Sequence, residues 1–194
     1  MLRQHLRPGV HPLYTMWWLF CLISMNAWIW STVFHSRDKP LTEIFDYIAA
    51  ISLIFSQFSC CVVRMMYRTR FQRYTIFPIG LILAFFLYHA HYLLFIEMNF
   101  GYNMKVNVTV GLVNVICWLI WSTKNFLAGR VYVWPCTLSV ILTLLFAALE
   151  LADFPPIAWL IDAHALWHFS TIILPFLWYR FVIEDSKYLL RVYW

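Results

Sequence analysis

Six apolar stretches, each about as long as a bilayer is thick, constrain this 194-residue chain more than any other feature. A helix needs about 20 mostly apolar residues to cross the hydrocarbon core. Stretches of this kind run over residues 13–34, 44–63, 74–96, 106–122, 131–151 and 157–182. Since the backbone polar groups of a segment in lipid must be satisfied within the segment, each stretch is predicted to be a helix.

Composition excludes the soluble alternative. Hydrophobic residues make up 63% of the chain and charged residues only 12%, which is more apolar surface than a soluble core of this length could bury. The predicted fold class is therefore all-α, a polytopic transmembrane helical bundle with six spans. Residues 1–12 are predicted to be a cytosolic N-terminal segment, residues 13–183 the membrane domain, and residues 184–194 a cytosolic C-terminal tail.

Basic residues predict the orientation of the spans. Most of the fourteen Lys and Arg fall at the two ends of the chain and in alternate connections, and only Arg37, Lys39 and Lys105 fall in the other connections. By the positive-inside rule, both termini are predicted to be cytosolic. The net charge of +5 is then a topology signal, and nucleic-acid binding is not expected because the basic residues are divided among separate loops.

Polar residues at one depth of these stretches predict a site. His164 and His168 lie four residues apart in the last stretch, and Ser31 and His35 have the same spacing at the end of the first. Residues at i and i+4 lie about 6 Å apart along a helix axis and share a face. Asp46 lies early in the second stretch. The predicted topology puts all five residues in the lumenal third of the membrane, where polar side chains usually mark function.

Three neutral imidazoles from two helices, with an open fourth position, are typical of catalytic zinc. The predicted ligands are His35, His164 and His168. Asp46 would orient or deprotonate a water, and Ser31 would donate a hydrogen bond to the oxyanion, so the implied reaction is hydrolysis of an acyl bond near the membrane surface. Histidine also suits copper, nickel or iron, so zinc is inferred from the chemistry.

Simpler interpretations remain open for each feature. Either pair taken alone is more often a set of packing residues, and the Ser31 hydroxyl could bond back to its own helix. Histidines on helices also ligate haem, although bis-histidine haem usually takes its ligands from different helices. Packing is favoured for His89 and His91, which are two residues apart and therefore on different faces. The acids near the fifth connection, Glu150 and Asp153, are expected to face water without a direct role.

Ordered motifs along nearly the whole chain carry a family resemblance. They include Asn26-Ala-Trp-Ile-Trp-Ser-Thr-Val-Phe-His-Ser-Arg-Asp38, Leu149-Glu-Leu-Ala-Asp-Phe-Pro-Pro156 and Asp162-Ala-His-Ala-Leu-Trp-His168. With them the chain resembles the post-GPI-attachment phospholipase family, which belongs to a superfamily of membrane hydrolases with alkaline ceramidases and adiponectin-receptor-like proteins. Members have a further helix before the point where this chain begins, so this chain is expected to be the seven-helix bundle without its first helix.

The resemblance implies a substrate and a compartment. It implies that His35, His164 and His168 bind Zn²⁺, that Ser31 and Asp46 assist catalysis, and that the sn-2 fatty acid of GPI anchors is removed. The expected protein is a GPI-specific phospholipase A2-like hydrolase of the Golgi or endoplasmic reticulum membrane, with its site facing the lumen. The alternatives are a non-catalytic receptor or trafficking factor for GPI-anchored proteins and a ceramidase-like amide hydrolase. The oligomeric state is left open.

Overall fold

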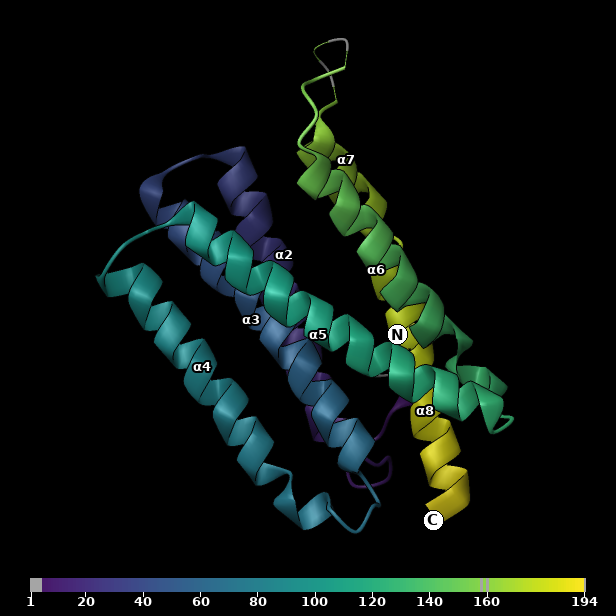
Figure 1. Ribbon diagram of the computed structural model, residues 1–194. Helices are drawn as coiled ribbons and strands as arrows, with labels where there is room; N and C mark the ends of the chain where they lie inside the picture. The colour runs from purple at the N-terminus through teal and green to yellow at the C-terminus, as the bar shows by residue number, and fades with distance from the viewer. Residues whose placement is uncertain (1–4, 158, 160, 194) are drawn as a thin grey trace. The chain divides into compact units, whose positions relative to one another are not determined.

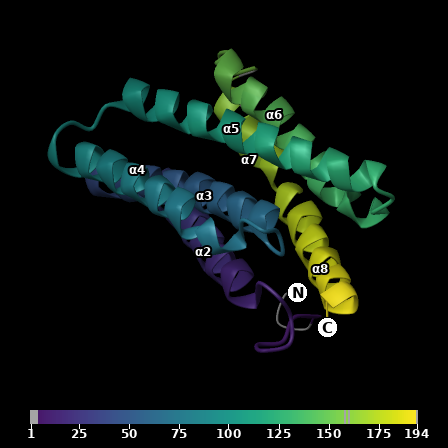
Figure 2. The ribbon, with the colours of Figure 1, turned by 60° about the horizontal axis from the view of Figure 1, so that its bottom comes forward.

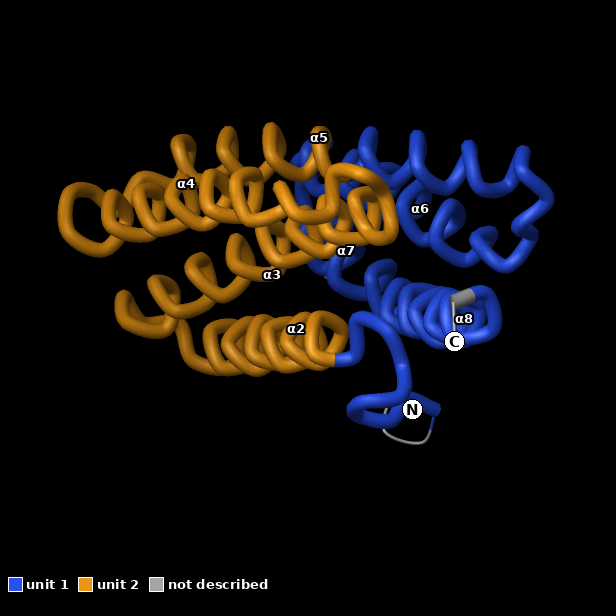
Figure 3. The backbone as a smooth tube through the Cα atoms, turned by 90° about the horizontal axis from the view of Figure 1, so that it is seen from below, with its two compact units in different colours: residues 1–14, 115–194 blue, residues 15–114 orange. Residues whose placement is uncertain are grey.

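The computed structural model describes residues 5–157, 159 and 161–193 (Figure 1). Residues 1–4 of the predicted N-terminal segment, residues 158 and 160 of the predicted sixth span and residue 194 of the predicted C-terminal tail therefore lie outside the described residues. The chain divides into two compact units, coloured separately in Figure 3: unit 1 comprises residues 1–14 and 115–194, and unit 2 comprises residues 15–114.

Unit 2 contains three helices and the first half of a fourth. They are α2 (Tyr14–Ser36), α3 (Pro40–Met66), α4 (Ile76–Phe95) and the part of α5 (Phe100–Leu127) that ends at residue 114, and the short 3-10 turn η1 (Gln72–Tyr74) precedes α4. α3 and α4 run side by side (Figure 2). The core of this unit joins Ile51 and Phe55 of α3 to Val106 and Val110 of α5.

The start of α3 shows why the chain turns so sharply between the first two spans. Pro40 occupies the first turn of the helix, where its missing N–H costs no intrahelical bond. The Thr42 hydroxyl oxygen lies 3.0 Å from the Lys39 backbone nitrogen and accepts its proton. These two residues start α3 soon after α2 has ended at Ser36, so the first two spans are joined by a very short connection.

Unit 1 contains the second half of α5 and three further helices, α6 (Trp134–Ala152), α7 (Ala163–Thr171) and α8 (Leu174–Tyr193), with the 3-10 turn η2 (Val131–Val133) before α6. Both α7 and α8 pack against α6. An aromatic cluster of Trp118, Trp121, Trp178 and Phe181 joins α5 to α8, with ring centroids 5.0 to 5.7 Å apart. Edge-to-face contacts of this kind add to the area that large rings bury.

The fold class is confirmed: in the described part of the chain, six helical stretches are long and apolar enough to cross a membrane. Large apolar side chains on their outer faces are exposed, for example Phe77 by 71%, Leu81 by 73% and Phe95 by 75%. Exposure on that scale would promote aggregation in water, whereas lipid tails solvate such side chains. The protein is therefore a multi-pass membrane protein. The assignment of its termini to the cytosol stays a prediction, as do the domain boundaries, of which the one at residue 183 falls inside α8.

The sixth span differs from its prediction at both ends of α7. The predicted helix begins at residue 157, whereas α7 begins at Ala163, because Pro155 and Pro156 disfavour a helix there and Ile157 pairs with Ile161 in a short antiparallel bridge. The helix is interrupted again at residues 172–173. Pro175 explains this second break, since it has no N–H to donate to the carbonyl one turn back. The span is thus made of two helices, α7 and α8.

Candidate metal centre

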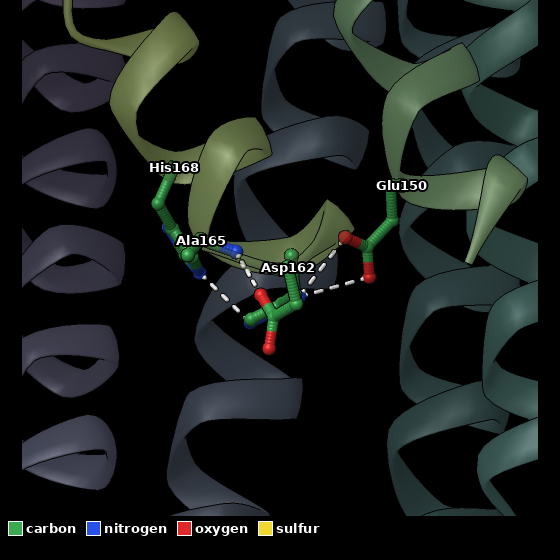
Figure 4. A network of polar contacts seen from close by, with 5 residues as sticks. Glu150, Asp162, Ala165 and His168 are labelled. Atoms are coloured by element: carbon green, nitrogen blue, oxygen red, sulfur yellow. Dashed lines mark hydrogen bonds and ion pairs between the residues drawn. The ribbon is translucent and has the colours of Figure 1, made fainter. Parts of the chain in front are cut away.

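The paired histidines lie on α7, a helix of nine residues with a strong start signal. Asp162 is its N-cap, and a carboxylate oxygen of Asp162 accepts a hydrogen bond from the Ala165 backbone N–H at 2.7 Å. Such a cap satisfies one of the backbone donors that the first turn of a helix leaves unpaired. Figure 4 shows this bond beside the histidine contacts. The cap fixes where α7 begins, one residue before His164.

The two imidazole rings meet at their Nε2 atoms. The Nε2 atoms of His164 and His168 lie 3.0 Å apart, and the rings are nearly perpendicular with centroids 4.6 Å apart. The prediction that the pair shares one face is confirmed. The His164 side chain is exposed and His168 is half-buried, so the pair is accessible at the surface of unit 1.

Glu150 approaches His164 from the last turn of α6. Its two carboxylate oxygens lie 2.9 and 3.0 Å from His164 Nδ1 (Figure 4). Because a carboxylate accepts and does not donate, the Nδ1–H group of His164 is the donor. In the neutral ring the lone pair then lies on Nε2, the nitrogen that faces His168.

This contact was missed by the sequence analysis, which expected Glu150 to face water. The side chain of Glu150 is only 23% exposed, because it packs against the neighbouring α7. The position of Glu150 in the sequence could have indicated the contact. It lies in the last turn of an apolar span, and this span ends on the same side of the membrane as the histidine pair. Asp153, the other acid at this connection, is exposed as predicted and ends α6 in a left-handed conformation with φ +42°.

Unit 2 carries the other predicted site residues at the adjoining ends of α2 and α3. Trp30 stacks on Phe45 with ring centroids 4.4 Å apart, and the rings of Phe34 and Tyr47 meet edge to face. The last turns of α2 therefore lie beside the second turn of α3. Ser31 and His35, one turn apart on α2, thus lie at the same end of this helix pair as Asp46.

The hydroxyl groups near the end of α2 differ in their bonding. Thr32 donates to the Trp28 carbonyl and Ser36 to the Thr32 carbonyl, each one turn back. For Ser31, in contrast, no hydrogen bond to its own helix is seen among the described residues. Its hydroxyl keeps a proton that it can donate elsewhere.

The histidines of α4 support the packing interpretation. His89 is fully buried, and its Nε2 lies 3.1 Å from the Asn103 side-chain oxygen of α5. His91 is exposed, and its ring lies beside that of Phe95 one turn further along the helix. His89 therefore joins two helices of unit 2, while His91 offers a comparison histidine outside the candidate site.

The donors of the α7 pair fit a zinc ion. Two ligands about 2.05 Å from a tetrahedral zinc are roughly 3.3 Å apart, close to the 3.0 Å between the two Nε2 atoms. A carboxylate on the far nitrogen is one of the common partners of a histidine that binds zinc. The pair would supply two ligands. That His35 supplies the third, and that Ser31 and Asp46 act beside it, stay predictions.

Together, the apolar helices and the histidine pair define a polytopic membrane protein with a candidate metal site at the start of its last span. The chain belongs to the Per1-like family, whose model matches residues 2–186. This membership confirms the resemblance seen in the sequence motifs.

Relatives with assigned names cover most of the chain. A protein of Danio rerio named GPI-specific phospholipase A2-like PGAP3 is 43% identical over 186 residues, which are 95% of this chain and 58% of the relative. The human protein of the same name is 41% identical, over 95% of this chain and 57% of the relative. Post-GPI attachment to proteins factor 3 of Drosophila melanogaster is 40% identical over 93% and 54%. The chain thus spans somewhat more than half the length of these relatives. No solved structure matches it.

Proposed function

We propose that this protein is a zinc-dependent membrane hydrolase that removes the sn-2 fatty acid from GPI anchors. The observation that carries the proposal is the α7 pair, in which two imidazole Nε2 atoms lie 3.0 Å apart and a carboxylate holds the far nitrogen of one ring. The names of the relatives support the substrate, since two of them are called GPI-specific phospholipase A2-like.

The proposed ligands are His35, His164 and His168. A zinc ion bound to three histidines supplies a Lewis acid that polarises a carbonyl and acidifies a water. Neutral imidazoles preserve the full positive charge of the ion. The His164 ring is held in its metal-binding tautomer by Glu150, so this ligand needs no rearrangement before it binds.

The residues of unit 2 have complementary roles in the proposed reaction. The Asp46 carboxylate accepts a proton from the water that attacks the ester carbonyl carbon. The Ser31 hydroxyl, unused by its own helix, donates a hydrogen bond to the carbonyl oxygen as negative charge develops on it. The carbon–oxygen bond of the ester then breaks, Asp46 returns its proton to the leaving alcohol oxygen, and the products are a free fatty acid and a lyso-lipid anchor.

The proposed setting is a multi-pass protein of the Golgi or endoplasmic reticulum membrane, with the site facing the lumen. Two arguments support it: the predicted orientation from the basic residues, and the position of a GPI anchor in the lumenal leaflet. The substrate then reaches the site from within its own leaflet.

Lipid analysis of GPI anchors tests the activity. Cells without their own copy of the gene are complemented with the wild-type chain, His164→Ala or His91→Ala, and the acyl chains of the anchors are measured by mass spectrometry. Wild type and His91→Ala should remove the original sn-2 chain, whereas His164→Ala should retain it. Removal by His164→Ala at the wild-type level would contradict the proposed catalytic site.

The same experiment distinguishes the proposed hydrolase from a trafficking factor, an alternative that the name of the Drosophila relative leaves open. A factor without catalytic activity would leave anchor lipids the same in all cells, and only the surface level of GPI-anchored proteins would change when the gene is removed. Release of sphingosine from ceramide, in turn, would indicate amide hydrolysis instead.

A further inference from the structure

We propose that Glu150 is a positioning residue, which holds His164 in the tautomer and orientation needed to bind the metal. The inference rests on the proposed function, because it assumes that His164 is a ligand. It goes beyond that proposal by assigning a role to an acid that is not itself a predicted ligand.

The contact is specific in its geometry. Both oxygens of Glu150 lie within 3.0 Å of the same nitrogen, His164 Nδ1, so the N–H group points between them. The Nε2 atom lies on the opposite edge of the ring, 3.0 Å from His168 Nε2. Glu150 therefore keeps the proton of His164 on Nδ1, the nitrogen that does not face His168.

The backbone places Glu150 for this contact. Asp153 ends α6 in a left-handed conformation, and its N–H donates to the Glu150 carbonyl at 3.3 Å. α7 then packs against α6, which brings together two side chains fourteen positions apart in the sequence. Both helix ends are thus fixed locally, by the turn at Asp153 and by the N-cap Asp162.

Stability alone does not explain the contact. The His164 side chain is 48% exposed, and contacts between exposed side chains contribute at most about 1 kcal/mol to the stability of a fold. Orientation of a ligand is a different effect, since losing the partner of a metal-binding histidine typically lowers metal affinity about 10- to 100-fold. The contact should therefore matter for zinc binding and little for folding.

Zinc affinity of the full chain, purified in detergent, tests the inference. We compare wild type with Glu150→Ala, which removes the acceptor, and with Glu150→Gln, which has nearly the same shape and keeps a neutral acceptor. Asp153→Asn is the matched control, because it removes a nearby acid from the same helix end and Asn tolerates a left-handed backbone. Affinity is measured by competition with a chromophoric chelator.

The zinc dissociation constant should rise about 10- to 100-fold in Glu150→Ala, rise less in Glu150→Gln and stay unchanged in Asp153→Asn. The visible absorption of the cobalt-substituted protein should change in Glu150→Ala, because the ligand field depends on the orientation of the imidazole. Unchanged thermal midpoints of the metal-free variants would show that the effect is not one of folding.

The outcomes distinguish this inference from the proposed function. If wild type binds zinc, His164→Ala loses it and both Glu150 variants bind as wild type does, the role of Glu150 is refuted while the metal site stands. If wild type binds no stoichiometric zinc, the metal site is refuted and the role of Glu150 with it.

Discussion

The N-cap of α7 offers a quantitative test of how local structure controls the site. α7 has only nine residues, and helices shorter than about 12 residues are marginal unless other interactions stabilise them. The bond from the Ala165 N–H to the Asp162 carboxylate, 2.7 Å long, is one such interaction. Replacing Asp162 with Ala removes it, whereas Asn at this position keeps a side-chain oxygen that can cap the helix.

Loss of an N-cap costs about 1 kcal/mol. Since about 1.4 kcal/mol corresponds to a factor of ten, the population of the ordered helix falls by at most roughly five-fold. Only the ordered helix presents both His164 and His168, so the apparent dissociation constant for zinc should rise by up to the same factor. Asp162→Asn should differ little from wild type.

Two measurements on the purified chain check this prediction. Chelator competition gives the zinc affinity, and hydrogen exchange followed by mass spectrometry reports the protection of the α7 amides, including that of Ala165. Exchange in α7 should be faster in Asp162→Ala and close to wild type in Asp162→Asn. Unchanged exchange and affinity in Asp162→Ala would refute the reasoning.

Three further predictions concern the helices that support the site. His89→Ala leaves the buried Asn103 amide without its partner and should destabilise the protein by about 1 kcal/mol, measured in detergent as a lower thermal midpoint; an unchanged midpoint would contradict the packing role of His89. Tyr132→Phe removes a 2.9 Å hydrogen bond to the fully buried Asp185 and should lower the free energy of unfolding by about 1.5 to 3 kcal/mol in the same assay. An unchanged thermal midpoint would show that this bond does not stabilise the protein. Pro175→Ala restores a backbone donor and should slow hydrogen exchange between α7 and α8, and exchange as fast as in wild type would show that another feature causes the break.

Hydropathy predicted the spans well because it measures the property that lipid selects. The predicted ends were less accurate. The second span was expected from residue 44, while α3 begins at Pro40, because the polar residues Thr42 and Glu43 lower the local hydropathy without preventing a helix. The sixth span was expected from residue 157, since an apolar run does not distinguish extended backbone from helix when two prolines precede it.

The candidate site was predictable only in part. A four-residue spacing is sufficient to place His164 and His168 on one face, because that property follows from helix geometry alone. The contact of Glu150 with His164 was not predictable in the same way, since it depends on how α6 and α7 pack and on the turn that joins them. Spacing on one helix is local information, whereas a contact between two helices is not.

Metal content of the purified protein tests the central claim most directly. Wild type and His91→Ala should each contain about one zinc per chain after extensive dialysis, and His168→Ala should contain almost none. Wild-type protein without stoichiometric zinc, or a His168→Ala variant that retains it, would contradict the claim that the paired histidines of α7 bind the catalytic metal.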